Sequence, residues 1–282
     1  MNSFVKSILF YLLSLGIFGG ISVLALTGTI SYTAFALALG CHIVVFFILK
    51  RYQKKIKALM EEDERISLIL YKELDPEKFL EKIVSSFEKN KLYAEIWLRN
   101  KMDLGVGFNA SGRIEEQIEL YENLLLKGNN QRYLSKSLRS AIYSNLTVAY
   151  LSNGNLNKAL QYYETFKTHY DYKLMRRHRP NVIKRIEAKI AYLEGSYDEA
   201  LNSMCSLLHT ELTNYQKMDT HFYLGQIYKE IGDVKSQREH LQYVAKHGNK
   251  LHIANVAREM LINMDKSSGT GGSDENRKRT DE

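Results

Sequence analysis

Residues 142–166 read IYSNLTVAYLSNGNLNKALQYYETF, and this stretch decides the fold that the sequence predicts. In its first half, four residues occupy positions i, i+3, i+4 and i+7, which lie on one face of a helix. They are Tyr143, Leu146, Thr147 and Tyr150. Asn153-Gly154-Asn155 interrupts that spacing. A second helical face begins beyond it, at Leu156, Leu160 and Tyr163. The stretch therefore predicts two helices joined by a tight turn.

The pattern resembles the tetratricopeptide repeat (TPR). In that family, large-x2-Leu-small-x2-aromatic is followed by a Gly turn and by Ala-x3-aromatic. The matching residues are Tyr143, Leu146, Thr147, Tyr150, Ala159 and Tyr163. Two slots differ in type, because Thr147 replaces a Gly and Asp171 stands in place of the closing Pro. One such repeat cannot bury its own apolar face, so we expect neighbouring repeats.

Three weaker copies surround this unit, which makes four divergent units over residues 92–248. They lie at 92–128, 181–209 and 218–248. The turn glycines of the four units are Gly112, Gly154, Gly195 and Gly232. Their spacings of 42, 41 and 37 residues exceed the repeat length of about 34, so we expect extra residues between units. The resemblance implies an all-α fold with a TPR-like α-solenoid. The alternative is an ordinary helical bundle without a superhelical groove.

The segments on either side of the repeats are predicted to close the ends of the solenoid. Residues 58–91 read as a linker helix and an N-terminal cap, with Asp75-Pro76 as a helix start. Residues 249–265 suit a C-terminal capping helix. Residues 266–282 contain no large apolar side chain and predict a disordered tail.

The N-terminal region predicts a transmembrane hairpin in residues 1–57. Residues 4–26 contain one charge and residues 30–49 contain none, and a membrane span takes roughly 20 apolar residues. A basic juxtamembrane flank follows: Lys50, Arg51, Lys54, Lys55 and Lys57. By the positive-inside rule this flank lies in the cytoplasm. We therefore expect a multi-pass cell-membrane protein with two spans, with both termini and the repeat domain cytoplasmic and with lipid contacts through the hairpin and flank.

The charge of the chain argues against nucleic acid as a partner. The formal charge is +7, and residues 1–57 contribute six cations and no acid, which leaves 7 − 6 = +1 for the other 225 residues. The basic excess therefore belongs to the N-terminal flank. Two cysteines, Cys41 and Cys205, provide no disulfide framework.

Sequence signatures of catalysis are missing from the chain. It contains no Gly-rich phosphate loop after a strand pattern, no CxxC pair and no GxSxG elbow. His240, His247 and His252 are too widely spaced for one metal ion without other ligands. We therefore expect no enzyme activity, no cofactor and no metal.

The resemblance implies that a protein or peptide partner binds to the first helices of the repeats. The residues carried over to these groove positions are Arg99, Met102, Asn109, Ser144, Val148, Leu151, Arg185, Lys189, Tyr192, Phe222, Gln226 and Lys229. Arg185, Lys189 and Lys229 with two aromatic rings predict a basic groove for an extended peptide or an acidic C-terminus. The alternative is that these are ordinary solvated basic residues.

A second basic run occupies residues 173–179, between the second and third units. It is typical of a solvated connector, and the alternatives are a contact for acidic lipid head groups or for the acidic surface of a partner. Taken together, the sequence predicts a membrane-anchored scaffold that recruits or positions a protein partner. The alternative is a regulatory protein, tethered to the membrane, that senses a peptide.

Overall fold

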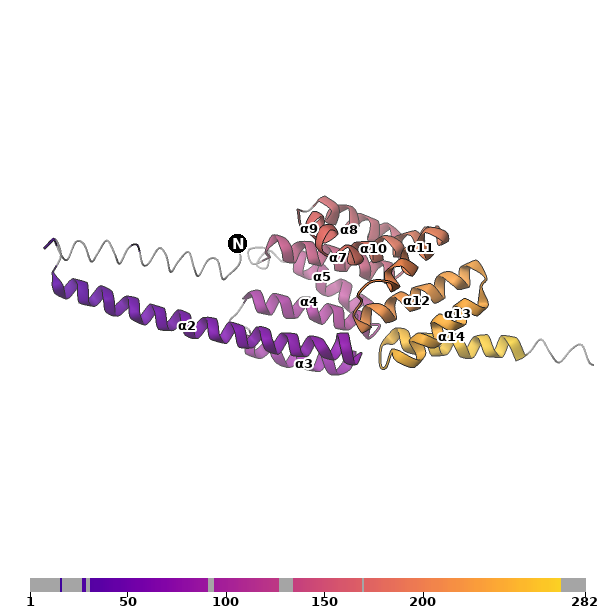
Figure 1. Ribbon diagram of the computed structural model, residues 1–282, viewed down its shortest axis with the longest axis horizontal. Coiled ribbons are helices and arrows are strands. Elements are labelled where there is room, and N and C mark those ends of the chain that lie inside the picture. The colour runs from indigo at the N-terminus through magenta and orange to yellow at the C-terminus, as the bar shows by residue number, and fades with distance from the viewer. Residues whose placement is uncertain are drawn as a thin grey trace, which may run out of the picture. The chain divides into compact units, whose positions relative to one another are not determined.

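The chain is almost entirely helical over the part that the structure describes. The computed structural model describes residues 16, 27–28, 31–90, 94–126, 134–168 and 170–269. Within these residues the regular elements are twelve α-helices and one π-helical segment, with no strand (Figure 1). The predicted all-α class is therefore confirmed. The chain divides into two compact units, Met1–Glu62 and Asp63–Glu282.

The predicted transmembrane hairpin, and with it the multi-pass cell-membrane localisation, is contradicted. Of the predicted first span, 4–26, all but Gly16 lies outside the described residues. The second predicted span falls in α2 (Tyr32–Leu68), which has 18 residues before its first charge at Lys50 and contains His42. Spanning a bilayer takes roughly 20 apolar residues. Among the described residues, no helix combines the length and the apolar character needed to cross a membrane.

The second unit consists of consecutive antiparallel helices that pack against their neighbours in sequence. Its elements are the π-helical segment η1 (Ile69–Glu73), α3 (Pro76–Asn90), α4 (Ala94–Ala110), α5 (Ile114–Leu126), α7 (Lys136–Ser152), α8 (Leu156–Thr168), α9 (Tyr170–His178), α10 (Pro180–Leu193), α11 (Tyr197–Leu208), α12 (Asn214–Ile231), α13 (Val234–His247) and α14 (His252–Gly269). The predicted turn at residues 153–155 separates α7 from α8, as expected. The other three predicted Gly turns likewise join α4 to α5, α10 to α11 and α12 to α13.

Glycine is required at these turns by the backbone. All four turn glycines have φ between +70° and +83°, the left-handed region that side chains with a Cβ disfavour. At Gly232 the conformation is the C-cap of α12, and the side chain of Asp233 then caps α13 by accepting a hydrogen bond from Ser236 N at 3.0 Å. The connection between α8 and α10 contains α9, a helix of nine residues that the sequence pattern did not predict.

The turn after η1 contacts the turn between α13 and α14, so the two ends of the second unit touch. The apolar stripe of α3, which was predicted to cover an open end, shares one core cluster with residues of α13 and α14. Phe79, Leu80 and Ile83 of this stripe are buried together with Leu251 and Ala254. The two segments predicted as separate caps therefore contribute to one core cluster.

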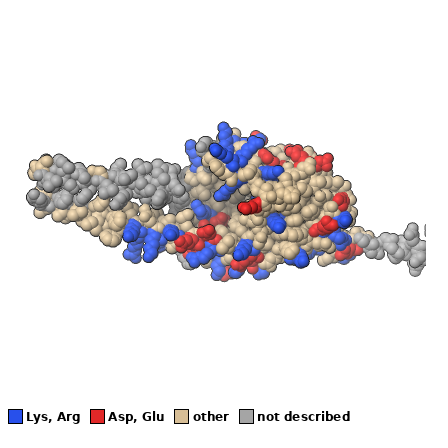
Figure 2. Space-filling view, in the orientation of Figure 1, with Lys and Arg blue, Asp and Glu red and all other residues tan. Residues whose placement is uncertain are grey.

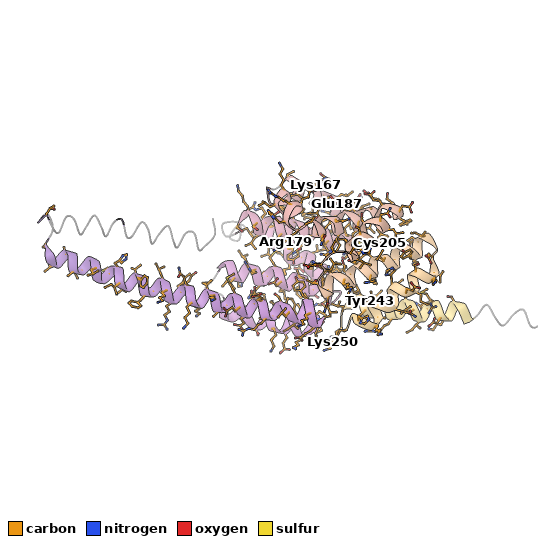
Figure 3. The ribbon with its side chains drawn as sticks, viewed as in Figure 1. Lys167, Arg179, Glu187, Cys205, Tyr243 and Lys250 are labelled. Carbon is orange, nitrogen blue, oxygen red and sulfur yellow. The ribbon has the colours of Figure 1, made fainter. Side chains whose placement is uncertain are left out.

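Polar contacts join the turn after η1 to the turn between α13 and α14, and we call this contact the seam. Asn249 Nδ2 donates to the carbonyl of Glu73 at 2.8 Å, and the main-chain N–H of Lys250 donates to the carbonyl of Leu74 at 3.3 Å. Lys250, labelled in Figure 3, also pairs its Nζ with Asp75 Oδ2 at 2.7 Å. Two residues of the seam, Leu74 (φ 59°) and Asn249 (φ 47°), are the non-glycine residues with positive φ among those described. Such residues cost about 1 kcal/mol or more each, so the seam holds its two turns in strained conformations.

The boundaries of the segments predicted at the C-terminus differ from the helix found there. The helix predicted for residues 249–265 is α14, which begins at His252 and continues to Gly269. Residues 266–269, predicted to begin a disordered tail, are therefore helical, and residues 270–282 lie outside the described part of the chain.

Candidate functional site

Two cations of the predicted basic groove pair with one acidic residue of the next helix pair. Arg185 and Lys189 lie one turn apart on α10, and both face Asp219 of α12. Lys189 Nζ lies 2.9 Å from Asp219 Oδ1, and Arg185 Nε lies 3.6 Å from Asp219 Oδ2. The side chains of Lys189, Asp219 and Arg185 are 3%, 14% and 16% exposed. Arg185 and Lys189 therefore belong to an interior ion cluster. The prediction that they form an open basic surface is wrong.

Burial and local charge set the state of this cluster. Burial lowers the pKa of Lys189, and the adjacent carboxylate of Asp219 opposes that change. The ammonium group also lies 4.2 Å above the ring centre of Tyr223, which favours the charged form by a cation–π interaction. Two cations against one carboxylate leave the cluster with a formal charge of +1.

A pocket lies directly beside the carboxylate of Asp219, where α4, α7, α12 and α14 meet. We call it the α12 pocket. Its volume is about 230 Å³. It is lined by Asn109, Ala110, Ile114, Ser152, Tyr215, Asp219, Phe222, Tyr223, Leu251, His252, Ile253 and Val256. Pockets for drug-sized molecules span about 300–1,000 Å³, so the α12 pocket suits one or two side chains or a chain end.

The polar atoms of the α12 pocket are held by hydrogen bonds to the surrounding helices. Tyr215 donates from its hydroxyl to Asn109 Oδ1 at 3.1 Å, and Asn109 Nδ2 donates to Gln117 Oε1 at 2.9 Å. Tyr71 packs edge-to-face against Tyr215, with ring centres 6.1 Å apart. These contacts fix the side of the pocket that faces α4, while Leu251, Ile253 and Val256 provide its apolar side.

The predicted groove residues lie in different surroundings. Asn109 and Phe222 line the α12 pocket, and Arg185 and Lys189 support it through Asp219. Met102, Ser144 and Leu151 are buried, and Tyr192 and Val148 are half-buried. Gln226 donates to Met260 Sδ at 3.4 Å. Arg99 and Lys229 are exposed and are not among the pocket-lining residues. Two of the twelve predicted groove residues, Asn109 and Phe222, therefore line the α12 pocket.

Sequence reasoning missed several residues of the pocket. Asp219 and Tyr215 lie three and seven residues before Phe222, so the helical period that selected Phe222 could have selected both. Leu251, His252, Ile253 and Val256 carried no such signal, because they reach the pocket through the seam rather than through the repeat pattern.

A second cluster of titratable side chains joins α12 to α13. His221 Nδ1 and His240 Nδ1 lie 2.8 Å apart, so one ring donates to the other. Tyr243 stacks on His221 with ring centres 3.9 Å apart, and Tyr228 stacks on His240 at 5.4 Å. Burial, followed by the nearby His240 and Lys217, lowers the pKa of His221 to about 4. Both rings are therefore neutral at pH 7.

Metal chemistry finds no support in the part of the chain that the structure covers. No group of three or more His, Cys, Asp or Glu side chains is arranged there to hold a metal ion.

Comparison of the chain with protein-family models, with curated proteins and with solved structures found no match.

Proposed function

We propose that this protein is a TPR-like α-solenoid, closed on itself at the seam, that binds a short segment of another protein in the α12 pocket. The observation that carries the proposal is the α12 pocket itself. It is largely apolar, has a few fixed polar atoms and lies where residues of α4, α7, α12 and α14 converge. Such a combination is typical of ligand sites.

The composition of the pocket favours a segment with one apolar or aromatic anchor. Phe222, Tyr223 and Val256 offer apolar and aromatic surface, and aromatic anchors in desolvated pockets supply most of the energy of peptide recognition. The +1 charge of the Arg185–Asp219–Lys189 cluster favours an acidic group beside that anchor. The segment would thus contain an apolar side chain next to a carboxylate.

A library of random dodecapeptides panned against the full chain tests this proposal. The selected peptide would be synthesised and its affinity measured by calorimetry. Val256→Trp fills the pocket with a large ring, while Val234→Trp places the same ring at a site that is 60% exposed at the start of α13. We expect Val256→Trp to weaken binding at least about tenfold and Val234→Trp to leave it unchanged. An equal loss of peptide affinity in the two variants would contradict the proposal.

A second candidate is a peptide sensor, and the position of the seam favours it. Asn249 and Lys250 of the seam directly precede Leu251 and His252 of the pocket. A ligand that moves Leu251 would therefore move the seam. Altered amide exchange of residues 72–75 on adding the selected peptide would favour the sensor, and unchanged exchange there would favour a static binding protein.

A further inference from the structure

The short helix α9 carries a cluster of cations on the surface. Lys173, Arg176, Arg177, His178 and Arg179 are all exposed, and we call them the α9 patch. Figure 2 shows Lys and Arg side chains gathered at the upper edge of the molecule, over the place where Figure 1 labels α9. Tyr172, which is 8% exposed, and Met175 attach the helix to the main core cluster. The apolar side of α9 thus serves the fold, and its basic side faces solvent.

The fold does not account for these charges. Lys173, Arg176 and Arg177 lie at i, i+3 and i+4, where like charges repel by a few tenths of a kcal/mol per pair. Among the described residues, no ion pair is recorded for any member of the α9 patch, whereas Lys167 on the preceding helix pairs with Glu164. The dipole of α9 favours cations in its last turn, but this reason does not extend to the whole cluster.

Arg179 is the least expected of these residues. It is the N-cap of α10, and its side chain makes no capping hydrogen bond. The N-terminal end of a helix carries a partial positive charge, so a cation there is unfavourable. Acidic or small polar residues usually occupy this position. An external anion beside Arg179 would relieve this unfavourable interaction.

The extent of the patch indicates the kind of anion. Residues 173–179 cover about 9 Å at 1.5 Å per residue. They contribute four formal charges to a region, 58–282, that carries only +1, so the rest of that region has 1 − 4 = −3. Nucleic-acid binding requires a basic surface that follows the backbone over several phosphates, and a net charge of −3 outside the patch does not favour such a partner. An acidic protein helix presents carboxylates at i, i+3 and i+4 over the same length.

We propose that the α9 patch docks an acidic segment of a partner protein, with its carboxylates paired to Lys173, Arg176, Arg177 and Arg179. Arginine and carboxylate form bidentate, charge-assisted hydrogen bonds, which suits a surface contact of this size. The site is separate from the α12 pocket and does not depend on the function proposed for it.

A fluorescein-labelled deca-glutamate peptide, titrated with the full chain and followed by anisotropy, tests the proposal. The variant is Arg176→Glu with Arg177→Glu. The matched control is Lys54→Glu with Lys55→Glu, which makes the same change of charge in the other basic run. We expect the α9 variant to weaken binding at least about tenfold and to reduce its salt dependence, while the control changes affinity less than about twofold.

Two results would overturn this proposal. The first is an equal loss of affinity in both variants, which would show only the effect of net charge. The second is tighter binding of deca-thymidylate or of anionic phospholipid vesicles than of deca-glutamate, with the same loss in the α9 variant, which would assign the patch to another class of partner. Circular dichroism of both variants confirms that they fold. Val256→Trp, which fills the α12 pocket, should leave deca-glutamate binding unchanged.

Discussion

Lys189 Nζ and Asp219 Oδ1 lie 2.9 Å apart in the interior of the second unit, with Lys189 3% exposed. The carboxylate that neutralises Lys189 also lines the α12 pocket, so the ion pair and the pocket share one residue. An interior charge that loses its partner is expensive, whereas a pair that is replaced by apolar groups of similar size is often neutral. The predicted consequences for stability follow from this asymmetry.

Asp219→Leu should destabilise the protein by about 3 kcal/mol in urea unfolding, because Lys189 and Arg185 then remain buried without a carboxylate. Lys189→Met added to Asp219→Leu should recover more than half of this loss. Asp265→Leu breaks the exposed pair with Arg238 and should cost less than about 1 kcal/mol. If the double variant is as unstable as Asp219→Leu, the ion-pair account of this cluster fails.

The histidine pair predicts a loss of stability in mild acid. Burial disfavours the imidazolium form, so the folded-state pKa of His221 is about 4, below its usual value of about 6.5. Between these values the unfolded chain binds more protons than the folded chain, so the stability falls as the pH decreases from 6.5 to 4. The other charged or titratable groups near the pair are Lys217, Glu239, His247 and the two stacked tyrosines, Tyr228 and Tyr243.

His221→Asn with His240→Asn should reduce this acid sensitivity. Because the rings are partly exposed, we expect the double variant to lose about 1 kcal/mol less than the wild type between pH 7 and pH 5. Urea unfolding at both pH values measures the difference. Parallel changes of stability in the two proteins would mean that the pair does not titrate as described.

Alanine substitutions at Gly112 and Gly154 separate the cost of backbone strain from the cost of steric overlap. Both have positive φ, but a Cβ at Gly154 meets nothing within 4 Å, whereas a Cβ at Gly112 would lie 2.5 Å from His252 Cγ. Gly154→Ala should therefore cost about 1 kcal/mol from its backbone conformation alone. Gly112→Ala should lower the free energy of unfolding in urea by more than this. It should also weaken binding of the selected peptide, because His252 lines the α12 pocket. Equal costs for the two substitutions would contradict the packing of His252 on this turn.

At Asn249 in the seam, we expect substitution by alanine to destabilise the protein more than substitution by glycine. Asn249→Ala loses the hydrogen bond to Glu73 and places alanine at φ 47°, for a total of about 2 kcal/mol. Asn249→Gly loses the same hydrogen bond but tolerates the backbone conformation, so it should cost about half as much. Asn157→Ala, on the exposed side of α8, is the control. If glycine is no better than alanine at residue 249, the backbone of the seam is not strained.

Much of the helical layout could be predicted from the sequence because it depends on local periodicity. The spacing of Tyr143, Leu146 and Tyr150 and the break at Gly154 predict α7, α8 and their turn. Asp75-Pro76 predicts the start of α3, where Asp75 Oδ1 accepts a hydrogen bond from Lys78 N at 3.1 Å. Such signals lie within a few residues of one another and do not require knowledge of the tertiary structure.

The seam and the pairing of Arg185 and Lys189 with Asp219 could not be predicted in the same way. Asn249 and Glu73 are 176 residues apart, and no periodic pattern links them. Arg185 and Lys189 were correctly placed on one face of a helix, but their effect on a ligand depends on Asp219, which reaches them only through the packing of α10 with α12. The uncharged run that begins at residue 30 is 20 residues long in the sequence. The helix found there does not combine the length and the apolar character that a membrane span needs.

Amide hydrogen exchange of the full chain, with and without the selected peptide, tests the central claim most directly. Peptide binding in the α12 pocket predicts slower exchange in three segments that are distant in sequence, residues 109–114, 215–223 and 251–256. Val256→Trp should abolish this protection and Val234→Trp should retain it. Protection confined to other helices, or to one of these segments alone, would contradict the assignment of the α12 pocket as the binding site.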